Sequence, residues 1–250
     1  MLERSFFVSM TVVLWDIDGT LVRGKGGRVS VGAYMRALQR ASGLERELVY
    51  PKNSAGMTDS GIALEVLAAA AMAEAEAHSL LPHFGTTYLA ELEQARQALL
   101  EDLLVLPGVP QILERLHELG VTQSLLTGNL QPVARLKLGL VGLDRYVDFD
   151  LGAYGSDHHD RTCLVPIVRQ RLGDRADANI VVVGDTPRDI ACARAGGVPV
   201  VAVATGNFKR EELEDADIVL DDLSDTAAVE KALLRYSTNS VDKRPHRLEA

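Results

Sequence analysis

Cysteine and positive charge are both scarce in this chain of 250 residues. Its two cysteines, Cys163 and Cys192, form no C-x-x-C pattern, so the sequence predicts neither a zinc site nor a disulfide framework and fits a reducing compartment. A formal net charge of −9 argues against nucleic acid or an anionic membrane as the main partner, because both require a basic face. An acidic protein can still bind a small anion through a local positive pocket and a metal ion.

Long hydrophobic runs are missing as well. The longest stretch of low charge, Val66–Met72, is alanine-rich and is soon followed by Glu74 and Glu76, so it is too short and too polar at its ends to cross a bilayer. The first residues, Met1–Met10, carry an acidic and a basic side chain and make a poor signal peptide. We therefore expect a cytoplasmic protein, and the sequence leaves its oligomeric state open.

Strand-like runs alternate with helix-like runs along most of the chain, and an apolar content of 47% is enough for a sizeable core. Such alternation predicts parallel βαβ units with right-handed crossovers. The first strand is predicted at the apolar, β-branched run Val12–Trp15, and a weaker one at Tyr146–Leu151. The other predicted strands are Val121–Leu126, Asn179–Val183, Val198–Val203 and Ile218–Leu220. Helical patterns fill the intervals at Val109–Leu119, Pro132–Leu140, Leu164–Leu172, Pro187–Ala195 and Thr226–Tyr236.

One region breaks this alternation. No strand is expected between about Gly26 and Leu104, and a helical segment of that length is too long for a single crossover. We therefore interpret residues 24–104 as an inserted all-helical cap. Its predicted helices are Val31–Ala41, Ser60–Glu76 and Thr87–Leu103.

The catalytic core is then made of residues 1–23 and 105–236. The two joints between core and cap are expected at Arg23–Gly27 and Leu104–Gly108, which contain glycine and proline. The tail, residues 237–250, is polar and mixed in charge and is expected to be disordered.

The most informative motif follows the first predicted strand. Asp16 and Asp18 are separated by one residue, and Gly19 permits a turn there. Two carboxylates this close repel each other unless a cation or a proton lies between them, and open α/β sheets bind ligands at the carboxyl ends of their strands. An ordinary Asp-Gly turn is the alternative. The pattern favours metal-assisted chemistry, with Asp16 attacking phosphorus and Asp18 transferring the proton.

A hydroxyl group ends the second predicted strand. Thr127 and the backbone N–H of Gly128 can both donate to an anionic phosphoryl oxygen. The alternative is a strand end followed by an Asn-type helix cap, and this motif alone does not decide between the two.

A second acidic strand end occurs at Asp185. Asp185 and Asp189 are four positions apart where a helix begins at Pro187, so both can face one point. Acidic side chains at a helix N-terminus are also stabilising by themselves. Together with the acids after the first strand, however, they favour a shared metal ion such as Mg2+, which prefers oxygen ligands.

A phosphate site also requires a fixed positive charge. Arg161 lies just before a predicted helix and can contact a carboxylate nucleophile and a phosphoryl oxygen together. Lys137, on the helix after Thr127, is its rival. For Lys137 we favour the interpretation of a solvent-exposed helix lysine.

These elements together resemble the motifs of the haloacid dehalogenase-like (HAD) hydrolase superfamily. The resemblance implies that Asp16 is the nucleophile and Asp18 the acid/base of the first motif. It further implies that Thr127 is the hydroxyl residue of the second motif and that Asp185 and Asp189 are the acids of the fourth. A Rossmann-like parallel sheet of strand order 5-4-1-2-3 is implied as well, with Mg2+ as the cofactor.

The third motif differs from the family pattern. It usually supplies a lysine where this sequence has Arg161, which keeps the charge but changes the geometry. In the implied arrangement, Asp16, the carbonyl of Asp18 and Asp185 hold the metal, Asp189 supports its shell, and Thr127, Gly128 and Arg161 bind the phosphoryl oxygens.

A helical cap inserted after the first motif is typical of the phosphoglycolate phosphatase-like branch. The loop Gly56–Asp59 can project toward the site, although we favour a plain helix N-terminus capped by Thr58 or Asp59. Family members that cleave carbon–halogen or phosphonate bonds lack the acid found here at Asp18. We therefore expect a Mg2+-dependent phosphatase for a small phosphorylated metabolite. The alternatives are a sugar phosphomutase of the same branch and a non-catalytic binding protein.

Overall fold

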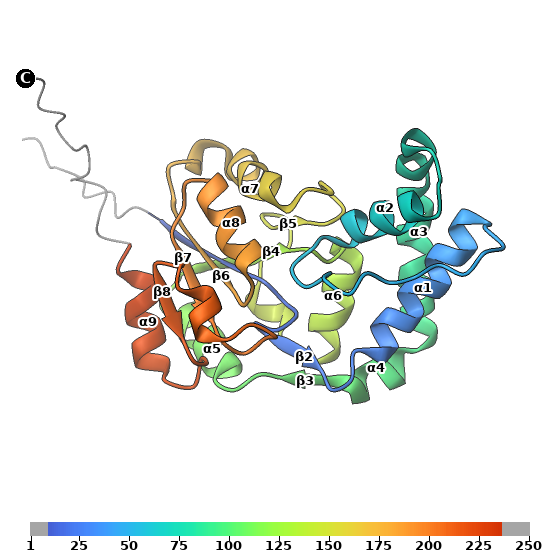
Figure 1. Ribbon diagram of the computed structural model, residues 1–250. Coiled ribbons are helices and arrows are strands. Elements are labelled where there is room, and N and C mark those ends of the chain that lie inside the picture. The colour runs from blue at the N-terminus through green and yellow to red at the C-terminus, as the bar shows by residue number, and fades with distance from the viewer. Residues whose placement is uncertain (1–9, 237–250) are drawn as a thin grey trace, which may run out of the picture.

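The computed structural model describes residues 10–236, whose central feature is a parallel sheet. Its six strands are arranged in the order β5-β4-β1-β6-β7-β8 (Figure 1). In sequence order they are β1 Thr11–Trp15, β4 Thr122–Thr127, β5 Ala153–Tyr154, β6 Asn179–Gly184, β7 Val200–Val203 and β8 Ile218–Leu220. The predicted order of five strands agrees with this arrangement, and β8 adds a sixth strand beside β7.

The third strand was predicted in the wrong place. Residues Tyr146–Leu151 form the end of a short 3-10 helix and a turn, and the strand that pairs with β4 is β5. Val147, Phe149 and Leu151 are buried, which explains their apolar pattern. Arg135 of the helix α6, Gln131–Leu140, lies 4.3 Å from the centre of the Phe149 ring. This segment is therefore covered by a helix without being paired as a strand.

Helices cover both faces of the sheet. Alternate residues of β1 point to opposite sides, so that Val13 and Trp15 join one hydrophobic core while Val12 and Leu14 join the other. The first core is shared with α5, α6 and α9, and the second with α7 and α8. These helices are α5 Val109–Glu118, α6 Gln131–Leu140, α7 Leu164–Leu172, α8 Pro187–Ala195 and α9 Thr226–Leu234. Short 3-10 helices lie at Asp144–Tyr146, Arg161–Cys163, Gly173–Arg175 and Arg210–Leu213.

Residues 25–102 are mainly helical and form a group of helices beside the sheet (Figure 1). These helices are α1 Arg28–Ser42, α2 Asp59–Ala69, α3 Glu74–Gln94 and α4 Arg96–Asp102. The predicted helix Ser60–Glu76 is in fact interrupted, because the chain turns at Ala71 with a φ of 57°. The predicted helix Thr87–Leu103 is likewise divided at Ala95 between α3 and α4.

Two short strands join this helical segment to the sheet-bearing part. β2, Val22–Gly24, pairs antiparallel with β3, Leu103–Val105, so that both passages of the chain run side by side. The sequence predicted no strand here, because each strand has three residues and its partner is far away in the sequence.

Aromatic side chains hold α1 against α3. The Tyr34 ring centre lies 4.8 Å from that of Phe84 and 5.1 Å from that of Tyr88, distances that are typical of favourable edge-to-face pairs. At the far end of the same helix pair, the buried carboxylate of Glu91 accepts hydrogen bonds from Arg36 and Arg40 of α1. A buried carboxylate is costly unless it is paired in this way.

The predicted disordered tail, residues 237–250, lies outside the described residues. Within residues 10–236, no helix has both the length and the apolar character needed to cross a membrane.

Candidate active site

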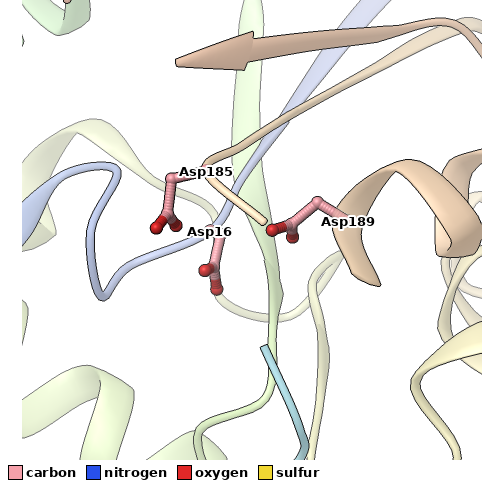
Figure 2. Close-up of side chains that lie close together, drawn as sticks. All are labelled: Asp16, Asp185 and Asp189. Atoms are coloured by element: carbon pink, nitrogen blue, oxygen red, sulfur yellow. The ribbon is translucent and has the colours of Figure 1, made fainter. Parts of the chain in front are cut away.

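Three neighbouring strands deliver polar side chains to one edge of the sheet. Asp16 follows β1, Thr127 ends β4 and Asp185 follows β6, and β1 pairs with both of the other strands. Because parallel strands end at the same edge, side chains from distant parts of the sequence converge there. Figure 2 shows the carboxylates of Asp16 and Asp185 facing the same region, with Asp189 of α8 beside them.

Three carboxylates form the centre of this cluster. One oxygen each of Asp16, Asp185 and Asp189 lies within 4.8 Å of the others, and all three residues are buried. Burial raises the pKa of Asp185 to about 8 and that of Asp16 to about 6, and repulsion between the neighbouring carboxylates adds to both shifts. The cluster therefore has more negative charge than its own surroundings balance.

A glycine allows the loop after β1 to approach this cluster. Gly19 has a φ of +90°, and a Cβ built on it would lie 2.3 Å from Oδ2 of Asp185. Any other residue here would be strained and would displace the Asp185 carboxylate. The predicted turn function of Gly19 is thus confirmed, and Thr20 donates from its hydroxyl to Oδ1 of Asp185 over 3.2 Å.

The Arg161 guanidinium lies between two of the three carboxylates. Its Nη2 is 3.1 Å from Oδ1 of Asp16 and also donates to Asp189. Burial by itself would lower the pKa of Arg161, but Asp189 and Asp16 raise it, so the side chain remains charged. Nη1 donates to the carbonyl of Gly56 over 2.9 Å. Arg161 therefore connects the carboxylates with the helical segment.

Asp189 is the member of the cluster that does not line the neighbouring cavity. Its Oδ2 accepts from the backbone and the hydroxyl of Thr186, and its other oxygen accepts from Arg161. With Thr186 it forms a capping box at the start of α8. Both oxygens of Asp189 are therefore already used, whereas Asp16 and Asp185 line the neighbouring cavity.

Thr127 and Gly128 occupy different positions with respect to this cavity. Gly128 lines it, while Thr127 is fully buried beneath it and donates from its hydroxyl to Asp16. A Cβ at Gly128 would lie 2.1 Å from the carbonyl oxygen of Met57. The glycine therefore permits the helical segment to come close to the end of β4.

The interpretation of Lys137 as a solvent-exposed lysine is wrong. Its side chain is buried, and Nζ donates to Asp18 Oδ2 over 2.6 Å, to Asp18 Oδ1 over 2.9 Å and to Asn129 Oδ1 over 2.8 Å. Burial by itself would raise the pKa of Asp18, but Lys137, with help from Asn129, holds it below its ordinary value. A signal was present in the sequence, since Lys137 follows Leu130 and Ala134 on the apolar face of α6.

Asn129 and Asp59 also belong to the site. Asn129 donates from Nδ2 to Asp18 over 2.8 Å and does not cap a helix. Thr58 caps α2, as favoured from the sequence, but Asp59 reaches the site as well. The Asp59 carboxylate accepts a hydrogen bond from the backbone N–H of Leu130 over 2.9 Å. The backbone N–H of Asp59 donates to the carbonyl of Gly128 over 2.7 Å.

A cavity of about 760 Å³ lies between the helical segment and the edge of the sheet. The predicted site residues that line it are Asp16, Asp18, Gly128, Arg161 and Asp185. Side chains of the helical segment form much of its wall, including Tyr34, Tyr50, Met57, Asp59, Ile62 and Tyr88.

The donor set at the base of the cavity fits a hard divalent cation. Asp16 and Asp185 offer carboxylate oxygens, which Mg2+ and similar ions prefer. Three buried carboxylates share a single guanidinium, that of Arg161, so a further cation would be favourable here. The carboxylates of these residues can therefore bind a metal ion.

A parallel sheet with helices on both faces and carboxylates at its carboxyl edge defines a Rossmann-like α/β enzyme. A profile of the haloacid dehalogenase-like hydrolases matches residues 10–197, so the chain belongs to that family. The prediction of a HAD-like hydrolase made from the motifs is thereby confirmed.

Curated relatives and solved structures agree with this assignment. The chain is 29% identical to a probable phosphatase, IndB, of Dickeya dadantii, with 92% of this chain and 97% of the relative covered. It is 24% identical to a phosphoglycolate phosphatase of Pseudomonas fluorescens, over 85% of this chain and 76% of the relative. A β-phosphoglucomutase of Clostridium difficile has a similar fold, with a TM-score of 0.63 at 14% identity, covering 91% of this chain and 98% of that one.

Proposed function

We propose that this protein is a Mg2+-dependent phosphatase acting on a small phosphorylated metabolite. The observation that carries the proposal is the convergence of Asp16, Asp185 and Arg161 at the base of one cavity. The names of two relatives, a probable phosphatase and a phosphoglycolate phosphatase, support hydrolysis of a phosphate ester. In the proposed division of labour, residues 24–104 are the cap and residues 1–23 and 105–236 the catalytic core.

In the first step, Asp16 attacks phosphorus in line and forms an aspartyl-phosphate while the alcohol leaves. Arg161 and Thr127 hold the Asp16 carboxylate in a fixed orientation. The Gly128 N–H and the Arg161 guanidinium are the proposed donors to the phosphoryl oxygens. Asp189 acts through Arg161, whose position it fixes.

Asp18 moves the protons. In the resting enzyme Lys137 favours its ionised form, which is the form that accepts a proton from water when the aspartyl-phosphate is hydrolysed. An incoming phosphoryl dianion raises the pKa of a nearby carboxylate, which allows Asp18 to deliver a proton to the leaving oxygen in the first step.

The metal ion would be held by the carboxylates of Asp16 and Asp185 and by the carbonyl of Asp18. When bound, Mg2+ neutralises charge on the transferring oxygens. The cap excludes bulk water from the cavity during the reaction.

Phosphate release from p-nitrophenyl phosphate, measured with Mg2+ and after its removal by EDTA, tests the proposal. We expect Mg2+-dependent release, and rates that survive complete chelation would contradict the metal requirement. An isomerisation assay with sugar phosphates, run in parallel, distinguishes the phosphomutase alternative, which would give a positional isomer without free phosphate.

A further inference from the structure

The cap-side wall of the cavity is acidic and rich in phenol groups. Asp59 contributes a carboxylate, and Tyr34, Tyr50 and Tyr88 lie near enough to interact with it electrostatically. Asp59 lines the same cavity as Asp16 and Asp18, and it lies near enough to interact electrostatically with Lys137, Asp18 and Asp16. The alcohol part of an ester bound at Asp16 therefore lies in the cavity that this wall bounds. The chemistry of the wall therefore bears on which alcohols fit.

The deep cations of the cavity are already engaged. Lys137 makes three hydrogen bonds, two to Asp18 and one to Asn129, which uses all the protons of an ammonium group. The Arg161 guanidinium is paired with Asp16 and Asp189. Lys137 cannot bind a second anionic group of a substrate without giving up a partner, and the Nε of Arg161, which has no hydrogen-bond partner among residues 10–236, is buried.

The remaining cations that line the cavity lie at its rim. Arg23 and Lys25 are both exposed. Arg23 donates to Asn207 and to the carbonyl of Thr205, while Lys25 donates to the carbonyl of Glu101. Both rim cations are therefore exposed and already hydrogen-bonded, whereas Asp59 is partly buried in the cavity wall.

A second, independent observation concerns the hydroxyl group of Tyr88. Tyr88 is 3% exposed and lines the cavity, and no residue of the described range 10–236 forms a hydrogen bond with its hydroxyl. This hydroxyl is not among the fully buried, unpartnered polar atoms of that range, so it is accessible from the cavity and can bond to a group that enters it. A hydroxyl group of the substrate is such a group.

We propose that Asp59 is a specificity-determining residue that selects phosphate esters of neutral, hydroxyl-bearing alcohols and rejects esters whose alcohol carries a carboxylate. The proposal rests on the phosphatase function proposed above. A substrate hydroxyl donates to the Asp59 carboxylate and pairs with the Tyr88 hydroxyl. A substrate carboxylate in the same place is repelled by Asp59. Of these two residues, only Tyr88 can then form a hydrogen bond with it.

Two pairs of esters test the proposal, because the members of each pair differ only in the group at issue. Glycerol 3-phosphate carries a hydroxymethyl group where 3-phosphoglycerate carries a carboxylate, and 2-hydroxyethyl phosphate has the same relation to 2-phosphoglycolate. Phosphate release gives kcat/KM for each ester with Mg2+ present. The wild-type protein is expected to prefer the neutral member of each pair by on the order of tenfold, the size expected for one nearby like charge.

Asp59→Asn removes the charge and keeps an oxygen that can accept from Leu130. It is expected to reduce the preference by about tenfold, mainly by raising kcat/KM for the two carboxylates. Glu76→Gln, the same charge change at an exposed position of α3 outside the cavity, should leave the preference unchanged. Tyr88→Phe is a second probe, which removes one hydroxyl and should lower kcat/KM for the neutral esters several-fold.

The outcomes separate the two proposals. Hydrolysis of p-nitrophenyl phosphate together with a preference for the carboxylates, or an Asp59→Asn variant with an unchanged preference, would overturn the inference about Asp59 alone. Failure to hydrolyse any of the esters, p-nitrophenyl phosphate included, would overturn the proposed phosphatase and with it this inference.

Discussion

Lys137 and Asp18 are 119 positions apart in the sequence, yet Nζ of Lys137 lies 2.6 Å from Oδ2 of Asp18. The pair connects the middle of α6 to the loop after β1, and Asn129 bonds to both partners. The site therefore contains two separate ion pairs, Arg161 with Asp16 and Lys137 with Asp18. Each pair fixes one of the two acids of the first motif.

Replacing Lys137 by Met is expected to lower kcat by roughly 10- to 100-fold, because Asp18 loses the partner that holds it. It should also raise the pKa of Asp18, so the acidic limb of the pH–rate profile moves to higher pH. Lys137→Arg, which keeps the charge, should shift the limb less. A lower rate with an unchanged profile in Lys137→Met would indicate that the lysine acts only by packing.

Arg161→Ala should reduce kcat/KM for p-nitrophenyl phosphate by roughly 1000-fold relative to wild type. Lys137→Ala should cause a smaller reduction. The guanidinium contacts both Asp16 and Asp189, and its removal leaves both buried carboxylates without their cation. Steady-state kinetics of the two variants, with circular dichroism as a check on folding, decides the order. The reverse order would show that Lys137 is the more important cation.

Asp16→Asn should lower kcat by at least about 1000-fold, since an amide cannot form the aspartyl-phosphate. The fold should be retained, because the amide oxygen still accepts from Arg161. Asp174→Asn, the same change at an exposed position of the short 3-10 helix Gly173–Arg175, is the matched control and should keep full activity. Substantial Mg2+-dependent turnover by Asp16→Asn would refute the assignment of the nucleophile.

The Asp185 carboxylate makes stability depend on pH when metal is removed. Because the folded-state pKa is raised to about 8, the folded protein binds more protons than the unfolded chain between the ordinary carboxyl pKa and that value. The contribution of Asp185 to the free energy of unfolding is therefore fully present below the ordinary carboxyl pKa, and it is lost as the pH rises from there through about 8.

Asp185→Asn should remove this loss. With EDTA present, the variant should be more stable than wild type by at least about 1 kcal/mol near the upper end of that range, and the difference should vanish at acidic pH. Urea unfolding at several pH values measures it. Added Mg2+ should stabilise wild type and have a smaller effect on the variant. A difference that does not change with pH would contradict the explanation.

The parts of the fold that the sequence predicted are those whose cause is local. The β1 run Val12–Trp15 is apolar over its whole length and begins with two β-branched valines, and its burial leaves little choice of structure. The acids at its end are predicted for the same reason, because a residue that follows a buried parallel strand lies at the carboxyl edge. Asp16 and Asp185 are brought together as the motif spacing predicted.

The parts that were missed depend on distant partners. β5 has two residues and is a strand only because β4 lies beside it. The alanine-rich run near Ala71 contains no proline or glycine to mark the end of α2. Lys137 was judged by residue type, and only the position of the Asp18 carboxylate makes its burial favourable.

The antiparallel ribbon formed by β2 and β3 has a mechanical consequence. Val22 pairs with Val105 and Gly24 with Leu103, so the chain that enters the helical segment and the chain that leaves it bend as one unit. A substitution that disturbs the pairing of either strand therefore acts on both passages of the chain at once.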